Sequence, residues 1–152
     1  MNKDTLYINK ALELAAIAGN GGDIPVGAVV VRDGKIIGTG YNRRECGKSS
    51  LAHAEIEAIG EACKALGGWR LSDCELYVTL EPCPMCAGAI INSRIKRVVY
   101  GTKDTKAGAF GSVLNMNSYP LNHKVELVSG VCEKECSKIL TDFFKNLRGK
   151  SE

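Results

Sequence analysis

Two short motifs contain the residue types that could do chemistry. The first contains His53 and Glu55, and the second, thirty residues further on, contains Cys83 and Cys86 in a C-x-x-C spacing. One imidazole and two thiols suit a zinc ion, and three protein ligands leave its fourth tetrahedral position open for an activated water. Glu55 lies two residues from His53, where it can move a proton without being a ligand. We therefore predict one Zn²⁺ ion per subunit held by His53, Cys83 and Cys86, with Glu55 as the catalytic residue.

Two other interpretations of these motifs explain fewer of the residues. A structural zinc site would need a fourth Cys or His ligand close by. A redox C-x-x-C of the thioredoxin type would leave His53 and Glu55 without a role. The catalytic zinc site accounts for all four residues.

The composition is that of an ordinary globular chain. We expect one domain over residues 1–152, because this length is enough to bury a core. The chain is 45% hydrophobic and 24% charged, with a net charge of +3, which is compatible with an RNA partner without requiring one. No apolar run approaches the ~20 residues of a membrane span, and the first residues lack a signal-peptide pattern. These features predict a cytoplasmic protein without a membrane association.

Seven cysteines fit that location. An odd number without disulfide-framework spacing indicates reduced thiols. We expect Cys63 and Cys74 to be small buried hydrophobes and Cys46 to be an exposed loop thiol. Cys132 and Cys136, spaced i, i+4, could form a second metal pair. They lack a third ligand, which favours packing.

Hydrophobic periodicity predicts the elements that must position the motifs. Helical spacing covers residues 5–18, 53–66 and 133–147, and a further predicted helix, entered through Pro82 and Pro84, carries Cys83 and Cys86. Strand patterns cover 26–31, 36–41, 75–80, 97–101 and 125–128. Asp4 or Thr5 can cap the first helix, and residues 32–35 form a hairpin turn. Strands alternating with helices predict an α/β fold, a three-layer α-β-α sandwich with a central mixed sheet of about five strands.

Both motifs fall at the start of predicted helices. His53 and Glu55 lie in the first turn of one helix, and Cys83 and Cys86 lie on the same side of the first turn of another. Because the amino end of a helix carries partial positive charge, both helix ends would help to keep the two thiols as thiolates.

The combination H-x-E with P-C-x-x-C is the signature of the zinc-dependent nucleobase and nucleoside deaminases. Cytidine, deoxycytidylate and guanine deaminases share it. Longer stretches narrow the resemblance, because the sequence from about residue 5 to 148 resembles the bacterial tRNA-specific adenosine deaminases. The matching segments are residues 24–29, 40–43, 52–55, 76–83, 85–88, 101, 104–108, 111–112, 122–123 and 142–144.

That resemblance implies a cytidine-deaminase-like fold and a homodimer with its substrate site near the subunit interface. It also implies that the substrate is the wobble adenosine of a tRNA anticodon stem-loop, which is converted to inosine. In this chemistry Glu55 takes a proton from the zinc-activated water, protonates the purine ring and then supplies a proton to the leaving ammonia.

The resemblance also assigns three substrate-binding positions. Asn42 matches the residue that hydrogen-bonds the flipped base, and Ala54 matches the residue whose backbone N–H faces the base or the metal-activated oxygen. Asp104 matches a residue that contacts the ribose, where a 2′-OH distinguishes RNA from DNA. From the residues alone, Asn42 could equally be a loop asparagine bonded to backbone, and Asp104 a turn aspartate.

Basic and aromatic side chains are concentrated late in the chain: Arg94, Lys96, Arg97, Lys103, Lys106, Phe143, Phe144, Lys145 and Arg148. Proteins hold RNA loops by phosphate contacts and aromatic stacking. We expect Phe144, Lys145 and Arg148 to face RNA from the terminal helix. Phe143 is expected in the core.

Three features depart from the family pattern and bear on substrate breadth: the loop 46–51, Pro84 and Phe110. Two other functions remain open. A deaminase of a free base or nucleoside, of guanine or cytidine type, would act without a folded anticodon arm. A catalytically silent RNA-binding or structural zinc protein would have no use for Glu55 beside an open metal site.

Overall fold

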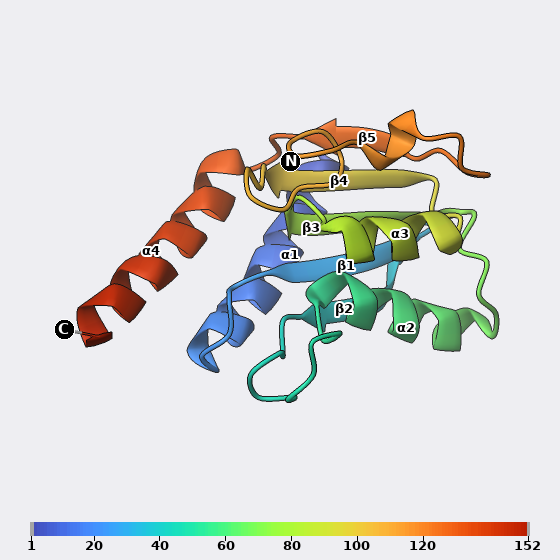
Figure 1. Ribbon diagram of the computed structural model, residues 1–152. Coiled ribbons are helices and arrows are strands. Elements are labelled where there is room, and N and C mark those ends of the chain that lie inside the picture. Colours follow the sequence, from blue (N-terminus) through green and yellow to red (C-terminus); the bar gives the residue numbers. More distant parts are fainter. Residues whose placement is uncertain (1, 152) are drawn as a thin grey trace.

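The structure, a computed structural model, describes residues 2–151 and confirms the three-layer α/β fold (Figure 1). The helices of this part of the chain are α1 (Lys3–Asn20), α2 (Ala54–Leu66), α3 (Pro84–Asn92) and α4 (Glu133–Ser151), with a short 3₁₀ helix at Met116–Ser118. The strands are β1 (Gly27–Arg32), β2 (Lys35–Tyr41), β3 (Cys74–Leu80), β4 (Arg97–Thr102) and β5 (Glu126–Ser129).

The five strands form one mixed sheet in the order β2-β1-β3-β4-β5. Strand β1 is antiparallel to both of its neighbours, whereas β3, β4 and β5 are parallel to one another. Strand β2 therefore runs in the same direction as β3 and β4, and these three strands end at the same side of the sheet. We call that side the carboxyl edge and the opposite side, where β3 and β4 begin, the amino edge.

Helices α2 and α3 cover one face of the sheet, and α1 and α4 lie on the other (Figure 1). Alternate residues of the strands supply the two halves of the core, since side chains of a strand point to opposite faces in turn. On β1, for example, Val30 packs under α2 and α3, whereas Val29 and Val31 pack with Ile8 of α1.

Helix α2, which carries one of the two motifs, packs unusually close to β2. A Cβ on Gly38 would lie 2.2 Å from the Ala58 carbonyl oxygen, and one on Gly40 would lie 2.2 Å from that of Ala54. Only glycine leaves room for this approach, so Gly38 and Gly40 set the position of α2 and of the motif at its start.

Two local predictions need correction. Asn2, rather than Asp4 or Thr5, caps α1, because its side chain accepts a hydrogen bond from the Thr5 N–H. The Asp4 carboxylate instead accepts hydrogen bonds from the Arg97 guanidinium at the start of β4. Phe110, expected as a residue that could touch substrate, is 3% exposed and packs in the core under α2 and α3.

Helix α4 contacts the sheet mainly through its first turns. Of its side chains that the structure describes, only that of Cys136 is buried. The remainder of the helix extends away from the sheet beside α1 (Figure 1). Its apolar residues Phe144 and Leu147 are therefore largely exposed.

Candidate metal centre and active site

The structure brings the two motifs together at the carboxyl edge. His53 is the N-cap residue of α2 and Cys83 is the N-cap residue of α3. Neither helix start has a side-chain cap, because both cap positions are occupied by the predicted ligands. The first-turn N–H groups of both helices thus point toward the ligand cluster, where they favour negative charge.

The donor atoms of His53, Cys83 and Cys86 all lie within 4.8 Å of one another. His53 Nδ1 is 3.7 Å from Cys83 Sγ and 3.5 Å from Cys86 Sγ. Ligands about 2.0 and 2.3 Å from a tetrahedral zinc ion would be separated by about 3.6 Å. The three residues can therefore hold one metal ion, and their donor set suits zinc.

Hydrogen bonds among the three ligands shift the pKa values of all three. A hydrogen bond with Cys86 lowers the pKa of Cys83 to about 4 against the opposing effect of burial, and His53 acts in the same direction. The pKa of Cys86 is raised, first by its hydrogen bond with Cys83 and then by burial. The hydrogen bond with Cys83 also raises the pKa of His53. Cys83 is thus the thiol that ionises first.

Glu55 lies in the first turn of α2 and is 4% exposed. Burial, followed by the negative charge of Cys83, raises its pKa to about 7, while its own backbone N–H and His53 oppose the shift. The carboxyl group also interacts with Cys86. A carboxyl group with this pKa can both take and give protons near neutral pH.

Asn42 connects the end of β2 to the start of α2. Its Oδ1 accepts the Ala54 N–H at 2.9 Å, and its Nδ2 donates to the Ile24 carbonyl at 3.1 Å. The side-chain amide keeps one further N–H, which fits the predicted contact with a base. The N–H of Ala54, in contrast, is occupied by Asn42, so the structure gives it a partner other than the expected substrate.

Asp104 lies in the loop that follows β4. Its Oδ1 accepts the backbone N–H groups of Lys106 at 3.0 Å and Ala107 at 3.1 Å. This is the turn-forming role that the residue type alone would suggest. Oδ2 has no hydrogen-bond partner among the described residues, so it can accept a further donor.

A cavity of about 630 Å³ runs from Asn42 to the distal half of α4. Its walls are Gly21, Gly22, Asp23, Ile24, Asn42, Arg44, Glu45, Phe143, Phe144 and Leu147. Phe143 and Phe144 meet edge to face, with ring centroids 5.4 Å apart. The prediction that Phe143 lies in the core is therefore wrong, because this half of α4 has no sheet beneath it.

Over its full length the chain is 49% identical to the tRNA-specific adenosine deaminase of Bacillus subtilis, 95% of which is covered. The chain belongs to this deaminase family. Residues 1–148 match the family model of the MafB19-like deaminases. A solved structure from work on A-to-I editing by tRNA:A34 deaminases at the wobble position superposes with a TM-score of 0.87 at 44% identity, covering 90% of this chain and 99% of that one. The guanine deaminase of Nitrosomonas europaea is more distant, with a TM-score of 0.79 at 26% identity over 94% of this chain and 85% of its own.

In this deaminase the late basic residues do not all lie on the same side of the sheet. Lys103 and Lys106 follow β4 at the carboxyl edge, and Lys145 and Arg148 lie on the exposed half of α4. Arg97 instead begins β4 at the amino edge, where it bonds Asp4 and Glu75. The sequence alone could not separate these groups, because that requires the direction of β4.

Arg94 also lies away from the metal centre. It caps α3 by donating to the Ile91 and Asn92 carbonyls and stacks over the ring of Trp69. The grouping of Arg94 and Arg97 with the RNA-facing residues is therefore not supported by their positions.

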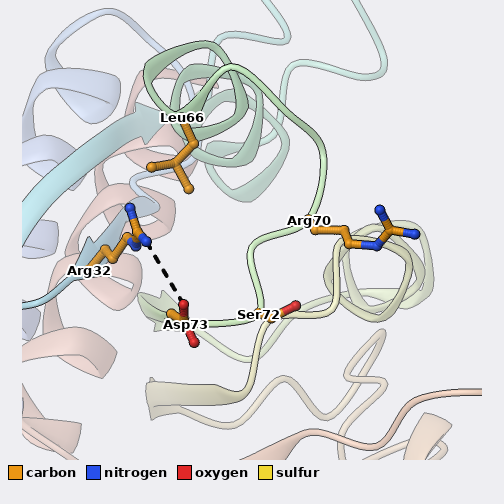
Figure 2. A pocket seen from close by; sticks show the side chains of 5 residues that line it. All are labelled: Arg32, Leu66, Arg70, Ser72 and Asp73. Atoms are coloured by element: carbon orange, nitrogen blue, oxygen red, sulfur yellow. Dashed lines mark ion pairs between the residues drawn. The ribbon is translucent and has the colours of Figure 1, made fainter.

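A second cavity, of about 330 Å³, lies at the amino edge (Figure 2). Arg32 and Asp73 form an ion pair of 3.9 Å across it, Leu66 lies beside them, and Arg70 points away. Ser72 also lines this cavity, but His53, Cys83 and Cys86 do not. Asp73 precedes β3, whereas Cys83 follows it. This cavity is separate from the metal centre.

Two buried carboxylates at the carboxyl edge were missed by sequence reasoning. Asp23 is 3% exposed and accepts the Glu45 N–H at 2.9 Å. Glu81 is 2% exposed and accepts four hydrogen bonds from the loop after β4. Their only signal in the sequence is an acidic residue at the border of a buried strand.

The remaining cysteines lie as predicted except Cys63, which was expected to be buried and is partly exposed. Cys74 and Cys136 are buried, Cys63 packs against the core, Cys132 is half-buried and Cys46 is exposed. Among the described residues, His53, Cys83 and Cys86 form the one group able to hold a metal ion. No helix among these residues is long and apolar enough to cross a membrane.

Proposed function

We propose that this chain deaminates the wobble adenosine of a tRNA anticodon loop to inosine by hydrolysis. The observation that carries the proposal is the junction at Asn42, where the metal-ligand cluster meets a cavity that reaches Phe144 on α4. A free nucleobase would need only the space beside the metal ligands, whereas the cavity of about 630 Å³ that begins at Asn42 has room for neighbouring nucleotides.

His53, Cys83 and Cys86 would hold a zinc ion, and their donor spacing supports this assignment. When bound, zinc would supply a water molecule whose pKa is lowered to about 7, and the oxygen of that water would be the nucleophile for the reacting carbon. Glu55 takes a proton from the attacking water and places it on the purine ring nitrogen. It then takes the second proton of the same oxygen, once this is bonded to C6, and delivers it to the amino group that leaves as ammonia. One carboxyl group can perform these steps because proton uptake and release alternate at the same position.

Asn42 would orient the base with its remaining N–H, and Asp104 would accept the ribose 2′-OH through Oδ2. Phe144 would stack on a base of the loop, and Arg148 would contact phosphate. The Ala54 N–H bonds the Asn42 side chain, so in this proposal Ala54 serves substrate binding by holding Asn42 in place.

Three further features belong to the same proposal. Residues 1–152 form one deaminase domain that acts in the cytoplasm, in keeping with seven free cysteines. The enzyme works as a homodimer, and exposed apolar side chains between β4 and β5, those of Val113, Tyr119 and Leu121, supply surface for the contact. Light scattering over a concentration series tests the dimer, and a monomer at all concentrations would contradict it.

The test of function is inosine formation measured by mass spectrometry. Zinc-loaded protein is incubated with an anticodon stem-loop bearing a wobble adenosine, and with free guanine, adenosine and cytidine in parallel. We expect inosine only in the stem-loop. Turnover of a free base or nucleoside alone would instead support the second candidate, a small-molecule deaminase, for which the shared fold of the guanine deaminase is the favouring observation.

A further inference from the structure

Glu81 directly follows β3 and precedes Cys83 by two residues. Its side chain is buried, and no described Lys or Arg forms an ion pair with it. Burying a carboxylate without a cation costs free energy unless hydrogen bonds satisfy its oxygens. A carboxylate buried two residues from the ligand Cys83 therefore has to be stabilised by hydrogen bonds.

Four donors from a single loop satisfy the Glu81 carboxylate. Oε1 accepts the Asp104 N–H at 3.1 Å and the Ser112 hydroxyl, while Oε2 accepts the Phe110 N–H at 3.0 Å and the Ser112 N–H at 3.1 Å. Each oxygen thus takes two hydrogen bonds. A glutamine could not reproduce this pattern, because its NH₂ group would face two donors.

The loop is shaped to close over this carboxylate. A Cβ on Gly108 would lie 2.4 Å from Glu81 Cδ, so only glycine allows the contact. The Gly108 N–H bonds the Asp104 carbonyl at 2.9 Å, and the Ala109 N–H bonds the Pro82 carbonyl at 2.9 Å. The segment 104–112, which we call the carboxylate loop, is therefore closed by a bond of its own and held to Pro82, the residue that follows Glu81.

We propose that Glu81 is a positioning residue that fixes the carboxylate loop relative to the Cys83–Cys86 turn, and so determines the preference for ribose at the target nucleotide. Glu81 binds the backbone N–H of Asp104, and the Asp104 carboxylate keeps Oδ2 available for a donor. The backbone of Glu81 continues through Pro82 to the ligand Cys83, and its side chain binds Asp104. The distance between the reacting centre and Asp104 therefore depends on the Glu81 side chain. The inference rests on the proposed function and adds a residue that touches neither metal nor substrate.

The test compares Glu81→Gln with Glu61→Gln, an exposed acid on α2, as the matched control. Two stem-loops are used, one all-RNA and one with a single 2′-deoxyadenosine at the target position. In Glu81→Gln we expect the ratio of kcat/KM for RNA over the deoxy substrate to fall about tenfold, with KM rising more than kcat falls and zinc content unchanged. Glu61→Gln keeps the wild-type ratio.

A double-mutant cycle connects the effect to Asp104. Asp104→Asn lowers the same ratio, and adding it to Glu81→Gln causes little further loss, because both changes remove one interaction. An unchanged ratio in Glu81→Gln, or fully additive losses, would overturn the inference.

Two measurements guard against misfolding and against failure of the proposed function. Ser112→Ala removes only the hydroxyl donor, and we expect a shift of the ratio in the same direction of about threefold. Hydrogen exchange at the Asp104, Phe110 and Ser112 amides should accelerate in Glu81→Gln, and unchanged protection would overturn the inference. If the wild-type protein makes no inosine, the proposed function fails, and amide exchange alone then decides whether Glu81 holds the loop.

Discussion

The two edges of the sheet treat charged side chains in opposite ways. At the amino edge, charges neutralise one another. Arg97 donates to Asp4 at 2.7 Å and to Glu75 at 2.7 Å, and Arg32 pairs with Asp73. These pairs join α1 to the sheet and close the end of β1 against the start of β3.

At the carboxyl edge, the buried carboxylates lack such partners, whereas Arg43 and Glu57, which lie nearer the surface, form an ion pair of 2.8 Å. Glu55 and Glu81 are both buried without an ion pair to any described cation, and Lys103 and Lys106 have no ion pair within residues 2–151. Unpaired buried charge costs free energy, so a fold keeps it where hydrogen bonds or function require it. The comparison indicates that the amino edge serves stability, whereas the carboxyl edge keeps unpaired charged groups that the proposed function would use.

The largest effect is expected from removing a metal ligand. Cys83→Ser should reduce bound zinc and lower inosine formation to background, because the remaining ligands no longer complete the site. Metal content by plasma mass spectrometry and turnover of the stem-loop measure both effects. Cys46→Ser, which changes an exposed thiol, is the matched control and should keep both metal and activity. Full zinc binding by Cys83→Ser would contradict the ligand assignment.

Loss of the proton carrier should be nearly as severe without affecting the metal. We expect Glu55→Ala to lower single-turnover inosine formation by about 10²–10⁴-fold, the usual contribution of general acid–base catalysis. Zinc content should remain at the wild-type level. Glu61→Ala, on the same helix but exposed, should be unaffected. Retained turnover in Glu55→Ala would exclude the role assigned to this carboxyl group.

The sequence predicted that His53, Cys83 and Cys86 come together, and it predicted their surroundings less well, for a geometric reason. Each motif lies at the start of a helix, where local spacing determines which side chains share a face. The residues concerned are His53, Glu55, Cys83 and Cys86. The five strands and the two helical layers also followed the hydrophobic pattern, whereas the strand order was not predicted.

Contacts between distant segments could not be predicted in this way. These contacts depend on where separate segments of the chain meet. Examples are the partners of Arg97, the bond from Ala54 to Asn42 and the four donors to Glu81. Phe143 was misplaced for a related reason. Its helical periodicity is that of a buried face, but the helix runs past the sheet.

Changes in the cavity along α4 should weaken binding of the stem-loop and leave the chemical step intact. For Phe144→Ala we expect KM to rise about fivefold or more, since a base stacked on an aromatic ring contributes about 1–3 kcal/mol. Arg148→Ala should reduce the salt dependence of binding by about one phosphate contact. Both variants should keep kcat. Lys138→Ala, on the same helix but paired with Asp142, is the control. A fall in kcat alone would place these residues outside the binding surface.

The smallest effect tests the amino edge, where charge should matter for stability and not for catalysis. The hydrogen bond from Arg97 holds the pKa of Asp4 below its ordinary value of 3.8, although burial opposes the shift. Because the folded state lowers this pKa, the stabilisation is present above pH 3.8 and is lost as the pH falls through the lowered value. Burial acts to raise the pKa of Glu75, but hydrogen bonds from Arg97 and Lys3 outweigh it and lower that pKa too.

We therefore expect Asp4→Asn to reduce the free energy of unfolding by about 1–2 kcal/mol near neutral pH. The difference from wild type should shrink as the solution is acidified below pH 3.8, where Asp4 itself becomes protonated. Urea unfolding across this range measures the effect, and Asp142→Asn on α4, an exposed pair, should change little. A difference that stays constant with pH would mean that Asp4 acts through packing instead of charge. Inosine formation by Asp4→Asn should match wild type under conditions where both proteins are folded. Asp4 and its partner Arg97 lie at the amino edge, on the other side of the sheet from the metal ligands.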